Sequence, residues 1–343
     1  LAKGIPGESI LGLTFTNKAA REMRERLAAL VGAERAKTVT LGTFHAFCVK
    51  LLRKEIGKLG YLPNFTIADE SDQQGLLKQA AAAQGINREG FPLDQAAAMI
   101  SNWKNKLLTA RDARDAAEYD FEITAGTLYG EYQSMLEMQN MVDFDDMLLL
   151  VHRLFSEFPE VLERYRDRYR YLLVDEYQDT NDAQFTLVKM LAGERRNLCV
   201  VGDDDQSIYS WRGANIENIL DFPQHFPGAK VVKLEQNYRS SSRILGAANA
   251  AISGNARRHD KALWSALGEG EPVRVVKVGS GEEEADFIGA MIKQEMSNFP
   301  GRKYRDFAIL YRSNHLSRQL EQTLRGLGIP YRLVGGQEFF KRK

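Results

Sequence analysis

Several features that would assign a chain to a class at once are scarce in this sequence of 343 residues. No run of about 18 apolar residues occurs, so we expect no membrane span, and the opening LAKGIPGES lacks the apolar core of a signal peptide. Only two cysteines are present, Cys48 and Cys199, far apart and each within an apolar run. We therefore expect buried free thiols in a reducing cytoplasm rather than a disulfide or a metal pair.

The chain also lacks an excess of charge of either sign, with 46 basic and 46 acidic side chains. A protein that attracts nucleic acid through its overall field carries a clear positive balance, so any contact with a phosphate backbone has to be local. A hydrophobic content of 44% and a charged content of 27% are typical of soluble proteins. The length suggests two or three domains.

Apolar strands and amphipathic helices alternate along most of the chain. The strand-like runs SILGLTF and KTVTLGTF each precede a helix, and Thr16 or Asn17 can cap the first of these helices. Further strands are expected at YLLVDE, NLCVVGD and KVVKLEQ, and later at PVRVVKV, FAILYR and PYRLVGG. Such alternation predicts an α/β fold with a mostly parallel sheet. Residues 68–165 differ, because their nearly continuous helical spacing predicts an all-helical insertion.

Acidic residues follow the apolar strand directly in YLLVDEYQDTN, residues 171–181. Ligands of parallel α/β sheets lie beyond the carboxyl ends of the strands, where Asp175 would suit a Mg²⁺ ion. Glu176 could orient or deprotonate a water that attacks a phosphate. The alternative is that both carboxylates form a hydrogen-bonded cap on the next helix.

A second strand end, LCVVGDDDQSIYSWRGAN, repeats this design. Gln206 can hydrogen-bond a terminal phosphate without adding charge. Tyr209 and Trp211, beside Arg212, can form a stacking platform for unpaired bases. The alternative is that these aromatic residues are core anchors, although the neighbouring Gly, Ser and Asp disfavour a buried loop.

The third strand end is KLEQNYRSS. Tyr238 could stack on a purine, and Arg239 could reach a γ-phosphate as an arginine finger. A Tyr-Arg pair alone is common on protein surfaces. Its place after a strand, following two loops of phosphate-binding type, favours the functional role.

Seven blocks, taken in order, resemble the motif series of superfamily 1 DNA helicases of the UvrD/Rep/PcrA group, with the Rep branch the most similar. They are LTFTNKAAREMRERL, GTFHAFC, LLVDEYQDTN, VVGDDDQSIYSWRGAN, LEQNYRSS, AILYRSN and PYRLVGGQEFF. The resemblance spans essentially the whole chain. It implies an ATP-dependent motor that moves 3′ to 5′ on single-stranded DNA and separates duplexes.

The resemblance also implies a role for each matching residue. Asp175 and Glu176 would be the Mg²⁺ site, and Glu176 would activate water. Gln206 would sense the γ-phosphate, Tyr238 would stack on adenine, and Arg239 would stabilise transition-state charge. The positions that would stack on bases are Phe15, Phe144, Tyr209 and Trp211. The positions that would contact the DNA backbone or link it to the nucleotide are Thr14, Asn17, Thr43, His45 and Arg212.

The residues alone leave some of these roles open. Phe15 ends an apolar run and could belong to the core. His45 has no Cys or His partner at metal-binding spacing, which leaves a structural or a DNA-side hydrogen bond. In ISNWKNK, Trp103 is expected to pack between helices while Lys104 and Lys106 stay solvated.

By this resemblance the α/β fold consists of RecA-like (P-loop NTPase) motor domains. Residues 1–67 and 166–230 would form the first, the helical insertion would occupy 68–165, and residues 231–343 would form the first part of the second. No G-x-x-x-x-G-K-[ST] sequence occurs, and the family carries that phosphate-binding loop before LTFTNKAA. We therefore expect an internal piece of a helicase that does not hydrolyse ATP by itself.

The expected cofactors are ATP and Mg²⁺. The expected partners are single-stranded DNA, junctions of single-stranded and duplex DNA, and repair or replication loading proteins. Two alternatives are the motor subunit of a helicase–nuclease and a non-catalytic single-strand-binding protein on a decayed motor fold. Asp175, Glu176, Gln206 and Arg239 are all intact, which argues against decay.

Overall fold

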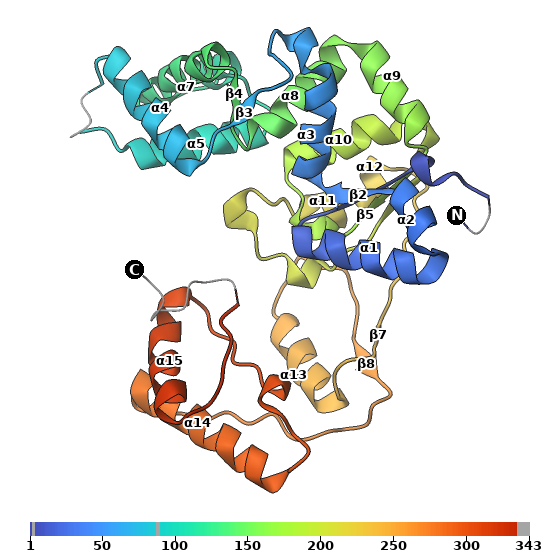
Figure 1. Ribbon diagram of the computed structural model, residues 1–343, viewed down its shortest axis with the longest axis vertical. Coiled ribbons are helices and arrows are strands. Elements are labelled where there is room, and N and C mark those ends of the chain that lie inside the picture. Colours follow the sequence, from blue (N-terminus) through green and yellow to red (C-terminus); the bar gives the residue numbers. More distant parts are fainter. Residues whose placement is uncertain (2–3, 87–89, 335–343) are drawn as a thin grey trace. The chain divides into compact units, whose positions relative to one another are not determined.

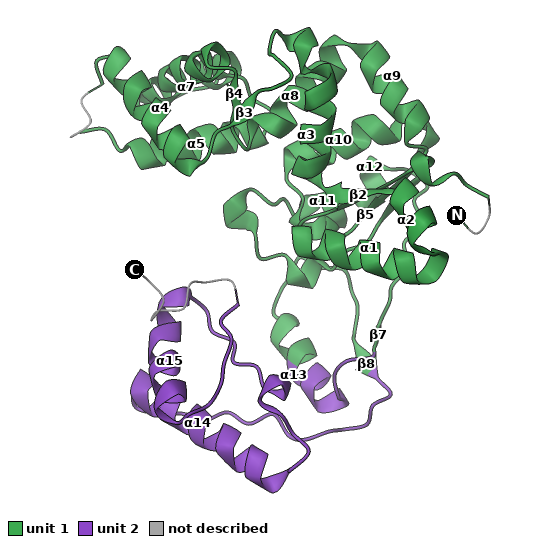
Figure 2. Ribbon diagram, in the orientation of Figure 1, with its two compact units in different colours: residues 1–237, 248–264 green, residues 238–247, 265–343 purple. Residues whose placement is uncertain are grey.

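The structure is a computed structural model that describes residues 1, 4–86 and 90–334 (Figure 1). The chain divides into two compact units, Leu1–Asn237 with Ala248–Trp264 and Tyr238–Ala247 with Ser265–Lys343 (Figure 2). The predicted division into parts that meet near residues 67, 165 and 230 stays a prediction. The last block of the resemblance, PYRLVGGQEFF, lies partly outside the described residues.

A four-stranded parallel sheet organises the first unit, in the order β2-β1-β5-β6. Its strands are β1 (Ile10–Thr14), β2 (Thr40–Thr43), β5 (Tyr171–Val174) and β6 (Leu198–Val200). Leu13 pairs with Val174, and Val174 pairs with Val200, so the carboxyl ends of these strands meet at one edge. The four strands predicted in this region are therefore confirmed, together with the α/β fold class.

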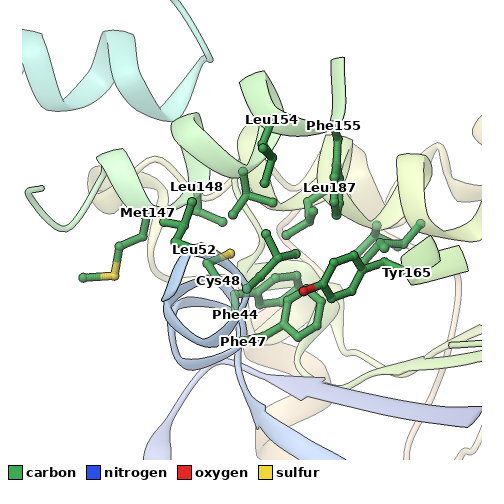
Figure 3. Close-up of a cluster of buried hydrophobic side chains, with 14 of the residues drawn as sticks. Phe44, Phe47, Cys48, Leu52, Met147, Leu148, Leu154, Phe155, Tyr165 and Leu187 are labelled. Carbon is green, nitrogen blue, oxygen red and sulfur yellow. The ribbon is translucent and has the colours of Figure 1, made fainter. Parts of the chain in front are cut away.

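The main core of the first unit lies between this sheet and the helices α3 (Phe44–Glu55), α8 (Asp146–Glu157) and α10 (Asp182–Ala192). Figure 3 shows Phe44, Phe47 and Leu52 of α3 facing apolar side chains of α8 and α10. Cys48 is buried in this core as predicted, but Cys199 is exposed, so that part of the prediction is wrong. Cys199 lies on β6, the last strand of the sheet, and successive side chains of a strand point to opposite faces.

A second core holds the helical segment together. The helices α4 (Glu70–Ala83), α5 (Leu93–Asn105) and α7 (Asp120–Met138) bury Leu77, Ile100 and Leu128 among themselves. The all-helical prediction for 68–165 is wrong in one detail, because β3 (Thr66–Ile67) and β4 (Met141–Val142) pair as a short parallel sheet. The chain enters and leaves the segment side by side, and pairing satisfies the polar groups of both backbones.

The other helices and strands lie in both units. They are α1 (Asn17–Val31), α2 (Ala33–Thr38), α6 (Ala110–Asp115), α9 (Pro159–Arg168), α11 (Glu217–Leu220), α12 (Phe222–His225), α13 (Ser242–Ile252), α14 (Gly281–Asn298), α15 (Ser317–Gly326), β7 (Gln236–Asn237) and β8 (Trp264–Ser265). None of the helices in the described residues is long and apolar enough to cross a bilayer.

The strands predicted in the last third of the chain are not found. KVVKLEQ contributes only its Gln236 to β7, and no strand is assigned within the described residues of PVRVVKV, FAILYR or PYRLVGG. The helices predicted between them do form, as α13, α14 and α15. Val275 is 95% exposed and Leu310 is 93% exposed. An apolar run becomes a strand only when a neighbour accepts its backbone hydrogen bonds, and among the described residues these runs lack one.

Candidate functional site

The carboxyl edge of β5 carries the two predicted site carboxylates. Asp175 continues the sheet, since its backbone N–H donates to the Leu13 carbonyl at 2.9 Å. Glu176 then turns the chain with a φ of 53°, in the left-handed region that non-glycine residues seldom adopt. Backbone of this kind is concentrated at functional sites because surrounding contacts have to enforce it.

The alternative role for these carboxylates, a cap on the next helix, is not what the structure has. The Asn181 side chain caps α10 instead, by accepting a hydrogen bond from the Gln184 backbone N–H at 2.8 Å. The short turn that begins after Glu176 has no side-chain cap. Neither Asp175 nor Glu176 therefore caps a helix through its side chain.

The chemistry of this edge fits a magnesium ion. Burial is the main reason that the pKa of Asp175 is raised from its usual value; the charge of Glu176 adds to the shift, while a hydrogen bond from the Glu176 backbone and the charge of Arg26 oppose it. Thr14, which ends the neighbouring strand, is buried, and its Oγ1 has no hydrogen-bond partner among the described residues. Among the described residues, no group of three or more His, Cys, Asp or Glu side chains is arranged to hold a metal ion. Mg²⁺ needs only one or two carboxylates when phosphates and water complete its shell.

A buried amide, Gln178, joins this edge to the next loop. Its Nε2 donates to Glu176 Oε2 at 2.9 Å, and its Oε1 accepts the Asp203 backbone N–H at 3.0 Å. Asp203 Oδ2 in turn accepts a hydrogen bond from Gln206 Nε2 at 2.7 Å. The structure thus brings Glu176 and Gln206 into one hydrogen-bonded path. Sequence analysis missed Gln178, whose only signal was its place two residues after Glu176.

A glycine lies where the two loops approach each other. A Cβ atom on Gly202 would lie 2.6 Å from Gln178 Oε1 and 2.7 Å from Ile219 Cδ1, so both side-chain ends would have to shift. Such a shift would disturb the hydrogen bond that Gln178 Oε1 accepts from the Asp203 backbone N–H. Gly202 therefore leaves room for the Gln178 amide.

The three aspartates of the second loop are paired with two basic side chains. Arg258 donates to both carboxylate oxygens of Asp205, at 2.8 and 2.7 Å. Lys261 Nζ lies 2.6 Å from Asp203 and 2.7 Å from Asp204. The hydrogen bond from Arg258 is the main reason that the pKa of Asp205 is lowered. Sequence analysis missed these basic partners, because they are more than 50 residues away along the chain.

Exposed aromatic side chains lie in the same loop as Gln206. The Phe15 and Tyr209 rings stack with their centroids 5.4 Å apart. Trp211 is 72% exposed, and the Arg212 guanidinium lies 4.7 Å from its ring centroid. Phe15 is half-buried and contacts a loop residue rather than the core clusters. The arrangement suits stacking on unpaired bases.

A second aromatic pair joins α3 to the residues just before α8. The His45 and Phe144 rings stack with their centroids 3.6 Å apart, and Phe144 is 53% exposed. Burial lowers the pKa of His45 to about 4, so its ring is neutral at physiological pH. Thr43, another predicted DNA contact, is buried and uses its hydroxyl to cap α3 through the Ala46 N–H at 3.2 Å.

The remaining predicted site residues are Asn17, Tyr238 and Arg239. Asn17 is exposed at the first position of α1, which Thr16 caps through the Ala19 N–H at 3.1 Å. Tyr238 and Arg239 are exposed residues of the second unit. Their predicted roles at the nucleotide stay a prediction.

A parallel sheet with paired carboxylates and phosphate-type loops at its carboxyl edge defines a RecA-like α/β protein. Residues 1–227 match the family model described as the UvrD/REP helicase N-terminal domain, and residues 232–343 match that of the UvrD-like helicase C-terminal domain. The chain belongs to the UvrD/REP helicase family, in the UvrD/PcrA group of superfamily 1.

Curated relatives resemble the chain over nearly its full extent. It is 45% identical over 342 residues to the ATP-dependent DNA helicase PcrA of Staphylococcus aureus (strain Mu50 / ATCC 700699), which covers 99% of this chain and 46% of the relative. It is 44% identical over 341 residues to the protein of the same name from Staphylococcus epidermidis (strain ATCC 12228 / FDA PCI 1200), with the same coverage. The chain therefore spans about half the length of these relatives.

Proposed function

We propose that the protein carrying this chain uses ATP and Mg²⁺ to move 3′ to 5′ along single-stranded DNA and to unwind duplexes at single-strand junctions. The observation that carries the proposal is the path Glu176–Gln178–Asp203–Gln206. It ties the carboxylate placed to activate water to a loop that also presents Tyr209 and Trp211. Nucleotide chemistry and strand contact would therefore share one structural unit.

The roles at the nucleotide follow from this geometry. Asp175 and Glu176 would hold Mg²⁺, which when bound neutralises phosphate charge. Glu176, oriented by the Gln178 amide, would deprotonate the attacking water, and Gln206 would hydrogen-bond the γ-phosphate. Tyr238 would stack on adenine, and Arg239 would stabilise charge in the transition state.

The strand would lie across aromatic rings of the first unit, of which Trp211 is exposed and Phe15 and Tyr209 are half-buried. Phe15, Tyr209 and Trp211 would stack on successive bases, each worth about 1–3 kcal/mol, which holds a strand and still permits release at each step. Phe144 would add a further stacking position beside His45. The residues proposed to contact the backbone are Thr14, Asn17, Thr43, His45 and Arg212. Repair or replication loading proteins in the cytoplasm are the proposed further partners.

Replacing Glu176 by Gln in the complete gene product tests the enzymatic role. Loss of a general base slows reactions by about 10²–10⁴-fold, so we expect DNA-stimulated ATP hydrolysis to fall by that factor while nucleotide binding remains. Steady-state phosphate release and fluorescent-nucleotide titration measure the two quantities. Unchanged turnover would overturn the base assignment. A wild-type protein that binds single strands without hydrolysing ATP would favour the non-catalytic alternative.

Replacing Trp211 by Ala tests the stacking surface. We expect single-stranded DNA affinity to fall by about 1–3 kcal/mol, the value of one stacked base, with little change in thermal stability because the ring is exposed. Fluorescence anisotropy with a labelled oligothymidine gives the affinity. Trp264→Ala is the matched control, since Trp264 is also exposed and lies outside this loop. Equal affinities of the two variants would contradict the proposal.

A further inference from the structure

A buried ionic group lies where the helical segment meets α8. Lys104 is fully buried, and its Nζ donates to Asp143 Oδ2 at 2.5 Å and to Asp146 Oδ1 at 2.8 Å. The prediction that Lys104 stays solvated is therefore wrong, whereas Lys106 is exposed as predicted. The acidic partners are about 40 residues away in sequence, and this distance hides the pairing.

This group fixes the short segment that presents Phe144. The backbone N–H of Asp143 donates to Asp146 Oδ2 at 3.2 Å, and that of Asp146 donates to Asp143 Oδ1 at 2.8 Å. The Tyr132 hydroxyl adds a hydrogen bond to Asp143 Oδ2 at 2.9 Å. Both ends of the segment are thus held, and Phe144 between them is left exposed on His45.

The remaining residue of the segment, Asp145, is held from α5. The Ser101 hydroxyl donates to Asp145 Oδ2 at 2.6 Å, and Asn105 Nδ2 donates to Asp145 Oδ1 at 3.0 Å. The same Asn105 accepts a hydrogen bond at its Oδ1 from Asn181 Nδ2 at 2.5 Å. Asn181 caps α10 and directly follows the turn that begins at Glu176.

We infer that Asn105 is a positioning residue that couples the Glu176 turn to Phe144, and through it to the bound strand. The inference rests on the proposed function. The Asn105 amide donates to Asp145 and to the Ser101 carbonyl and accepts from Asn181, so separating Asp145 from Asn181 would break a hydrogen bond of this half-buried side chain. When the Glu176 turn moves with the state of the nucleotide, Phe144 therefore moves with it.

Neither the nucleotide nor the DNA needs to touch Asn105 for this coupling. Lys104 holds Asp143 and Asp146 at the two ends of the Phe144 segment. A displacement of Asp145 would therefore move the Phe144 ring with it.

Asn105→Ala in the complete gene product tests the inference, with Asn102→Ala as the matched control on an exposed position of α5. Coupling between two sites typically changes an affinity or a response 5–150-fold. We expect Asn105→Ala to reduce the stimulation of ATP hydrolysis by oligothymidine at least about 5-fold, while DNA-independent hydrolysis and the melting temperature stay close to wild type. Asn102→Ala should keep full stimulation.

A double-mutant cycle with Phe144→Ala separates positioning from a merely structural role. We expect oligothymidine to stimulate ATP hydrolysis by the double variant as much as by the more impaired single variant, because both changes interrupt one path. The inference would be overturned if the losses of DNA stimulation in the two single variants multiplied in the double variant. It would also be overturned if Asn105→Ala lowered DNA-independent hydrolysis and the melting temperature but left the stimulation ratio unchanged. Should Asn105→Ala fail to fold, Asp145→Asn keeps the side-chain shape, and the same two outcomes decide. A wild-type protein without DNA stimulation would instead overturn the proposed function itself.

Discussion

Two groups of carboxylates in the first unit have opposite surroundings. Asp143 and Asp146 are buried around an internal cation, Lys104. Asp175 and Glu176 lie at the carboxyl edge of β5, and no Lys, Arg or His of the described residues forms a salt bridge with either. The first group includes a cation of the protein itself, and the second does not.

The electrostatics of the two groups follow from this difference. Burial is the largest influence on the pKa of Lys104 and lowers it, but the two aspartates together outweigh burial and hold the pKa well above its usual value. At the sheet edge, burial and the neighbouring Glu176 raise the pKa of Asp175. Removing the cation from the buried group would leave its carboxylates uncompensated, whereas the carboxylates at the sheet edge have no such internal partner to lose.

The largest change in the free energy of unfolding is expected on replacing Lys104, the cation of the buried group. Lys104→Met removes the cation and leaves two buried carboxylates without it, which typically costs about 3–5 kcal/mol. Urea denaturation followed by circular dichroism measures the loss. The exposed neighbour supplies the control, because Lys106→Met should change stability by no more than about 0.5 kcal/mol. Equal small losses in both variants would show that the buried pair contributes nothing.

A smaller, pH-dependent effect is expected at His45, which lies beside the segment that the buried group holds. An unfolded His gains a proton below about pH 6.5, while folded His45 stays neutral down to its pKa of about 4. The free energy of unfolding is therefore unaffected by His45 above about pH 6.5. It decreases by about 1–3 kcal/mol as the pH falls toward 4, because protons then bind the unfolded chain first. Unfolding free energies at several pH values, compared with those of His45→Gln, measure it. An equally steep pH dependence in the variant would exclude this origin.

The smallest change in stability is expected at the carboxylates of the sheet edge, Asp175 and Glu176. Asp175→Asn breaks no internal ion pair, so without Mg²⁺ the free energy of unfolding should stay within about 0.5 kcal/mol of wild type. In the complete gene product the variant should instead lose the Mg²⁺-dependent part of the thermal stabilisation by a nucleotide. Thermal melts with and without Mg²⁺ and a non-hydrolysable ATP analogue test both statements. A large loss of stability without ligand would make Asp175 structural.

Sequence analysis placed the first sheet because apolar β-favouring runs followed by polar residues are a local signal. The same signal failed at PVRVVKV and FAILYR, where the described residues provide no pairing neighbour. Asp175, Glu176 and Gln206 were predicted as site residues from their place after strands. Gln178 and Asn105 were not predicted, because an amide has the same appearance in sequence whether it is solvated or joins two loops.

The order of strands and helices in the first unit, the acidic strand ends and the aromatic loop were determined by the sequence itself, since each depends on residues close together in the chain. The pairing of Lys104 with Asp143 and Asp146, and the bridge from Asn181 through Asn105 to Asp145, were decided only by the tertiary structure. Their partners lie roughly 40–80 residues apart, and burial is what turns such distant polar groups into obligatory partners.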